Sequence, residues 1–69
     1  MVEVFKTNVE NTEYAEHLLR KLMAHYPNFH INFDLQDCDR ILRVEGRNIE
    51  SRRIIEVVCH SGFDCQVLE

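Results

Sequence analysis

The sequence predicts a single α+β domain in which the chain runs strand, helix, strand, strand, helix, strand. Four short segments are rich in β-branched and aromatic residues, and two of them are joined by only a few polar residues. Two longer segments space their apolar residues three and four positions apart, as one face of a helix requires. Two glycines and one proline in 69 residues leave almost all of the chain free to form regular elements.

Residues 2–7 predict the first strand, and the polar residues 8–11 predict a loop after it.

We expect a helix over residues 12–25. Asn11 or Thr12 can cap this helix by accepting a hydrogen bond from a free backbone N–H. Pro27 ends it, because the residue before a proline is pushed out of the helical backbone region. The apolar face consists of Ala15, Leu18, Leu19, Leu22, Met23 and Tyr26.

Residues 29–35 alternate between apolar and polar side chains, which is typical of a half-buried strand with one wet face. The polar connection over residues 36–40 is short, so the next strand, 41–45, forms an antiparallel hairpin with it. Leu42 and Val44 are the expected core pair of that strand. The sequence thus predicts a hairpin in the middle of the chain.

A second helix follows the turn at residues 46–48, with Asn48 as the expected cap and an end near residue 60. Ile54, Ile55, Val58 and Cys59 are among its buried candidates. Gly62 fits the left-handed backbone position that often ends a helix. Residues 63–68 then predict the last strand.

With right-handed crossovers, this βαββαβ order gives a ferredoxin-like sandwich over residues 1–69. It has a four-stranded antiparallel sheet with both helices on one face, and the other face is open to solvent. By strand alternation we expect this open face to carry Phe5, Ile41 and Leu68 as an apolar contact surface. Glu3, Arg43 and His30 are expected beside them.

Charge and composition exclude several classes of function. The net charge is −4, from 8 basic and 12 acidic residues, so nucleic-acid binding is not expected. No segment reaches the roughly 18 apolar residues of a membrane span, and no signal peptide is apparent. We therefore expect a cytoplasmic protein, and we expect no cofactor. Cys38, Cys59 and Cys65 are odd in number and lack a secretory context, so reduced thiols are expected.

Several weak motifs in the second half occur in a consistent order. They are the alternating strand 29–35, the acidic hairpin 36–40, the triplet Val44-Glu45-Gly46, the helix end at Gly62-Phe63, and the short strand 65–68. In this order and in the lengths of its elements, the chain resembles the heavy-metal-associated domain family over essentially its whole length. The resemblance implies the ferredoxin-like scaffold of that family.

In that family a Met-x-Cys-x-x-Cys segment opens the first helix and binds a soft metal ion through two thiolates. The resemblance places the methionine position at Val9 and the two cysteine positions at Asn11 and Tyr14. Neither asparagine nor tyrosine offers the sulfur ligand that Cu(I) selects. The chain therefore resembles a member of this family that lacks the two metal-binding cysteines.

Two functions remain as hypotheses. The leading one is a non-catalytic module that contacts a protein partner or a second copy through the open sheet face. The alternative is a copper or zinc site built from Cys38 and His60, with Cys65 or His17, because the connections that carry Asn11, Tyr14, Cys38, His60 and Phe63 meet at one end of the fold. A ligand-sensing module of the same topology is a further alternative, although its usual glycine-rich loop is missing. No phosphate loop or oriented nucleophile pair predicts an enzyme.

Overall fold

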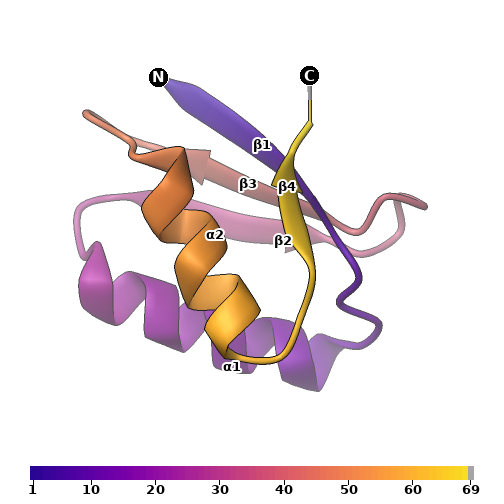
Figure 1. The fold of residues 1–69 in the computed structure, drawn as a ribbon. Coiled ribbons are helices and arrows are strands. Elements are labelled where there is room, and N and C mark those ends of the chain that lie inside the picture. The colour runs from indigo at the N-terminus through magenta and orange to yellow at the C-terminus, as the bar shows by residue number, and fades with distance from the viewer. Residues whose placement is uncertain (69) are drawn as a thin grey trace.

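A computed structural model describes residues 1–68 and confirms the predicted order of elements. The elements are β1 (Val2–Thr7), α1 (Thr12–His25), β2 (His30–Asp34), β3 (Ile41–Glu45), α2 (Ser51–His60) and β4 (Cys65–Val67). The strands lie in the order β2-β3-β1-β4, and every neighbouring pair is antiparallel. With α1 and α2 covering one face of the sheet (Figure 1), this is the ferredoxin-like sandwich.

The hydrophobic core lies between the sheet and the two helices. In the register of the sheet, Phe5 pairs with Leu42, and Leu42 pairs in turn with Phe33, so these side chains share the covered face. Leu42 and Val44 are fully buried, as predicted. The remaining fully buried hydrophobic residues are Phe5, Val9, Leu18, Leu22, Ile54 and Val58.

The helices match the predicted segments closely, except at the start of α2. Asn48 does not cap this helix, because it adopts a left-handed backbone with φ of 56° and the helix begins only at Ser51. Asparagine tolerates this conformation better than most residues do. Cys59, expected in the core, is exposed. The left-handed conformation predicted for Gly62 is confirmed, with φ of 96°.

The predicted facing of β1 is wrong by one residue. Phe5 has no exposed surface and lies in the core, so it cannot contribute to a contact surface on the open face. Val2, Val4 and Lys6 alternate with Phe5 and therefore point to the open side. Four of the first five residues are apolar, so alternation within this strand alone does not decide which set is buried.

No helix in residues 1–68 is both long enough and apolar enough to span a bilayer.

Candidate functional site

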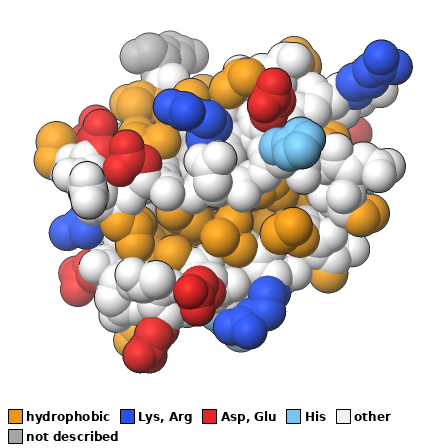
Figure 2. Space-filling model, turned by 180° about the vertical axis from the view of Figure 1, so that it is seen from behind, with side chains coloured by type: hydrophobic (Ala, Val, Ile, Leu, Met, Phe, Trp, Pro, Cys, Tyr) orange, Lys and Arg blue, Asp and Glu red, His pale blue; other side chains and the backbone are white. Residues whose placement is uncertain are grey.

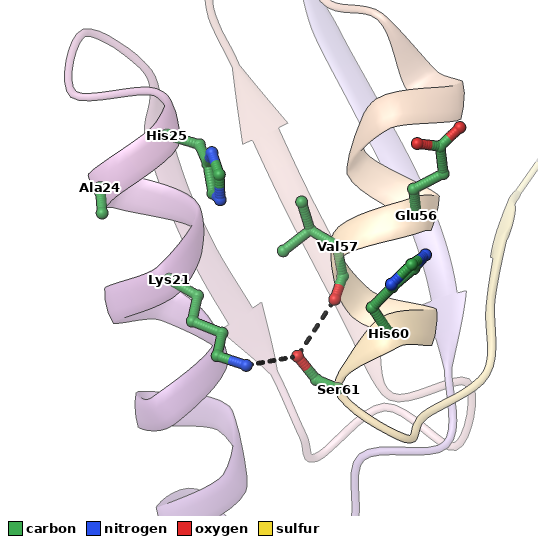
Figure 3. Close-up of a pocket in the computed structure, with 7 residues that line it drawn as sticks. All are labelled: Lys21, Ala24, His25, Glu56, Val57, His60 and Ser61. Carbon is green, nitrogen blue, oxygen red and sulfur yellow. Dashed lines mark hydrogen bonds between the residues drawn. The ribbon is translucent and has the colours of Figure 1, made fainter.

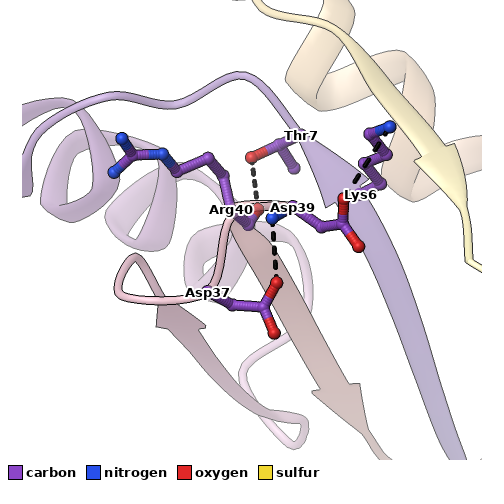
Figure 4. A network of polar contacts seen from close by, with 5 residues as sticks. All are labelled: Lys6, Thr7, Asp37, Asp39 and Arg40. Carbon is purple, nitrogen blue, oxygen red and sulfur yellow. Dashed lines mark hydrogen bonds and ion pairs between the residues drawn. The ribbon is translucent and has the colours of Figure 1, made fainter.

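The connections that the resemblance assigns to metal binding do meet at one end of the fold. The end of β1 is tied to the β2–β3 hairpin by two hydrogen bonds from Thr7, and Figure 4 shows the one from its hydroxyl. The Thr7 N–H donates to the Asp39 carbonyl at 3.1 Å, and the Thr7 hydroxyl donates to the Arg40 carbonyl at 2.6 Å. Lys6 and Asp39 add an ion pair at 3.8 Å. The hairpin is thereby fixed against the loop that leads into α1.

The same loop is tied on its other side to the connection between α2 and β4. The Asn8 side chain donates to the Asp64 carboxylate at 3.3 Å and accepts from the Asp64 N–H at 2.8 Å. The rings of Tyr14 and Phe63 pack with their centroids 5.4 Å apart. Phe63 therefore lies beside the position that the resemblance gives to the second cysteine.

At the two cysteine positions of the resemblance, the chain has structural contacts and no thiolate. The Asn11 side chain caps α1, since its Oδ1 accepts a hydrogen bond from the Tyr14 N–H at 2.9 Å. Tyr14 is half exposed and covers Phe63. Val9, at the methionine position, is fully buried. A helix cap and an aromatic pair thus occupy the place where two sulfur ligands would be needed.

Cys38 lies at the exposed tip of the hairpin, between Asp37 and Asp39. Within residues 1–68, these three residues form the one group whose possible ligand atoms all lie within 4.8 Å of one another. Both carboxylates already have other contacts, because Asp37 accepts from the Asp39 N–H at 2.8 Å and Asp39 faces Lys6. His60 is not a member of this group.

His60 belongs to a different surface, a hollow of about 430 Å³ between α1 and α2 (Figure 3). The Lys21 ammonium donates to the Ser61 hydroxyl at 3.2 Å, and that hydroxyl donates to the Val57 carbonyl at 3.1 Å. These bonds tie the two helices together across the hollow. His25 lines it from α1. The two residues of the predicted metal site, Cys38 and His60, therefore have separate surroundings.

The thiol of Cys65 is partly buried at the start of β4. Burial, with a smaller contribution from neighbouring Cys59, raises the pKa of Cys65 to about 12. Both cysteines line a hollow beside Lys6, Asn8 and Asp64. A thiol that stays protonated near neutral pH is a poor nucleophile and a poor metal ligand. Among the described residues, Cys65 is not a member of the group formed by Asp37, Cys38 and Asp39.

The open sheet face carries an apolar cluster that shares only Leu68 with the predicted one. Leu68 is 38% exposed and Val2 51%, and Val4 lies between them in the sheet, with its carbonyl accepting from the Leu68 N–H at 2.9 Å. Ile41 is only 7% exposed. Val2 and Val4 were missed because the facing of β1 was assigned wrongly. Of the predicted contact residues, Leu68 alone is well exposed.

A second apolar surface, the furrow between β2 and α1, was not predicted. Figure 2 shows a band of hydrophobic side chains across the middle of the back face, at the height where Figure 1 places β2 above α1. The furrow is lined by Ala15, Leu19, Phe33 and Leu35, with Glu16 and Asp34 among its polar neighbours. Leu19 also lines a smaller, neighbouring hollow together with Met23. Helical spacing identified these residues as apolar, but it did not show which of them stay uncovered.

Comparison with models of known protein families, with curated proteins and with solved structures found no match to this chain.

Proposed function

We propose that this domain is a non-catalytic binding module on a scaffold like that of heavy-metal-associated domains, and that it contacts a protein partner through its open sheet face. The observation that carries the proposal is the exposure of Val2 on β1 and of Leu68 directly after β4, beside the half-buried Val4. Exposed apolar residues grouped on a sheet and bordered by polar ones are typical of protein contact surfaces.

The polar border supports a specific contact. Lys6, Arg43 and Glu45 are exposed on the same face, and Arg43 and Glu45 lie opposite Val4 and Val2 in the register. A partner that covers the valines and Leu68 meets charges of both signs at its rim, which favours one orientation over others. Phe5 takes no part in this surface, and Ile41 adds little to it.

The contacts at the end of the fold where the three connections meet favour protein contact over metal transfer. The side-chain oxygen of Asn11 accepts the hydrogen bond that caps α1, and the ring of Tyr14 packs on that of Phe63. In the part of the chain that the structure describes, no group of three or more possible metal ligands combines a cysteine with a second cysteine or with a histidine.

Site-specific photo-crosslinking tests the proposed surface. A photoreactive side chain at Val4 or at Leu68 should give the same discrete product in cells, while one at Arg52, exposed on α2, should not. Val2→Glu should remove the product and leave the circular dichroism spectrum unchanged. The same product from all three positions, or from none, would contradict a contact through the open face.

Native mass spectrometry tests the metal alternative directly. The reduced protein, with Cu(I) and Zn²⁺ added in turn, should show no stoichiometric adduct. An adduct that is lost in Cys38→Ser would replace the proposed function with metal binding at the hairpin. Its loss in His60→Ala as well would show that Cys38 and His60 act together.

A further inference from the structure

Strand β2 is an edge strand that is paired on only one side. It lies at the end of the sheet order and pairs with β3 alone. An edge strand presents unpaired backbone N–H and C=O groups, and many proteins block such an edge with proline, lysine or a bulge. Residues 30–34 contain neither proline nor lysine, and their register with β3 is continuous. The edge is therefore open to a further strand.

The sequence of β2 is complementary to itself when it is reversed. If two copies run antiparallel and are centred on Asn32, His30 of each copy lies opposite Asp34 of the other. Ile31 then lies opposite Phe33. The imidazole N–H can donate to the carboxylate, and the apolar pair packs on the helix-covered side. Opposite-charge and apolar cross-strand pairs both stabilise an antiparallel ladder.

The furrow below β2 gives the same two-fold arrangement a second contact. Leu19 is half buried and Met23 is 49% exposed, both on the flank of α1 that lies beside the β2 edge. A two-fold axis through Asn32 brings the α1 helices of the two copies side by side under the joined strands. Each helix then covers apolar surface of the other. The apolar band in Figure 2 is the surface that this contact would bury.

From the open edge, the self-complementary strand and the exposed apolar furrow, we propose that two copies of this chain pair side by side through β2. The pairing is antiparallel and centred on Asn32, and it joins two four-stranded sheets into one of eight strands. It uses the edge of the sheet and not its open face, so it stands independently of the proposed function. The other edge strand, β4, spans only three residues and offers a much shorter ladder.

A cysteine at the two-fold axis gives the most direct test. In a Cys38→Ser/Cys59→Ser background, Asn32→Cys should form a covalent dimer under mild oxidation. Residues opposite each other in an antiparallel ladder have Cα atoms about 4.5–5.5 Å apart, within reach of a disulfide. Asp34→Cys in the same background is the matched control. Its two sulfurs would lie four residues apart along the ladder, about 13 Å, and should not join.

A charge exchange tests the register without oxidation. His30→Glu places a carboxylate opposite Asp34 of the other copy and should weaken dimerisation, measured by analytical ultracentrifugation, by about tenfold. The double variant His30→Glu/Asp34→Lys places opposite charges across the ladder and should recover the dimer. Gln66→Glu makes the same change of charge on β4, where Gln66 is exposed, and should leave the dimer intact.

Specific results would overturn the proposal. They are a wild-type protein that stays monomeric at millimolar concentration, cross-linking of Asp34→Cys as fast as that of Asn32→Cys, or a double variant that fails to recover. A monomer that instead binds an extended peptide along β2 would also overturn it. Thermal melts of each variant report folding, and the cysteine pair stays informative if His30→Glu unfolds. Leu68→Glu should leave this dimer intact, so failure here is distinguishable from failure of the open-face contact.

Discussion

The ring of Phe29 lies directly against Gly46, where a Cβ added to the glycine would come within 2.3 Å of the ring atom Cδ1. Phe29 has little freedom to move away, because its ring is stacked on Tyr26 with centroids 5.0 Å apart and planes at 4°. The glycine of the Val44-Glu45-Gly46 triplet is thus needed for its lack of a side chain. It lets the entry to β2 pack across the end of β3.

Gly46→Ala should therefore lower the free energy of unfolding, by about 1–3 kcal/mol, because the new methyl group overpacks against a ring that cannot retreat. Urea unfolding monitored by circular dichroism measures this change. In a Phe29→Ala background the same substitution should cost much less, since the opposing ring is gone. Equal costs in the two backgrounds would contradict the steric explanation.

Thr7 is the one buried polar residue among those described, and its hydroxyl makes two hydrogen bonds. It donates to the Arg40 carbonyl at 2.6 Å and accepts from the Val9 N–H at 3.2 Å. Thr7→Val keeps the shape and removes both bonds, so we expect a loss of about 1–3 kcal/mol in unfolding free energy. Thr7→Ser keeps the hydroxyl and should cost clearly less. A serine variant as unstable as the valine variant would assign the effect to packing.

Introducing a cysteine pair into the loop before α1 and its first turn tests the resemblance there. Asn11→Cys/Tyr14→Cys places two thiols three residues apart at the start of a helix, where the helix dipole favours thiolates. We expect this variant to bind one Cu(I) in native mass spectrometry. The single variant Asn11→Cys and the wild-type protein are the controls and should not. A double variant that takes up no metal would show that the loop lacks the geometry that the resemblance implies.

The shifted titration of Cys65 predicts how the three thiols react. At pH 8, iodoacetamide should modify the exposed Cys38 and Cys59 and largely spare Cys65, whose pKa of about 12 keeps it protonated. Peptide mapping by mass spectrometry measures each rate. The Cys65 rate should keep rising well above pH 9, where an ordinary thiol has levelled off.

The same shift links Cys65 to stability at alkaline pH. Because its thiol ionises near 9 in the unfolded chain and near 12 in the folded one, the unfolded state loses its proton first as the pH rises. The stabilising contribution is complete below pH 9 and is lost between 9 and 12. Cys65→Ala should flatten the fall in stability over that range. An unchanged slope would show that other groups cause it.

The fold could be predicted from the sequence because its strongest signals are local. The spacing of Leu18 and Leu22 set the first helix, and the alternation around Ile31 and Phe33 set the face of β2 correctly. The direction in which the side chains of β1 point could not be obtained in this way. Val2 and Val4 point to one side of the strand and Phe5 to the other, so both sides carry apolar residues. Only the pairing of Phe5 with Leu42 across the sheet decides it. Local periodicity contains no information about such a partner.

The candidate site was predictable in its location and not in its contacts. The topology alone brings the loops of Asn11, Tyr14 and Phe63 to one end. Whether Cys38 and His60 also meet depends on side-chain directions, and here one lies at a hairpin tip while the other lies between helices. The exposure of Leu19 in the furrow, and of Met23 beside it, depends on how α1 is placed relative to β2. No pattern of residues in the sequence determines that placement.

The position of β1 between β3 and β4 has a consequence for how the protein is made. β1 comes first among the strands of this domain, and it pairs with Ile41–Glu45 on one side and with Cys65–Val67 on the other. Its first partner follows only after α1 and β2, and its second only after α2. Contacts this distant in sequence also make folding slow compared with that of a helical bundle of equal length. During synthesis, β1 therefore stays unpaired until β3 has been made, and it remains an edge strand until β4 follows.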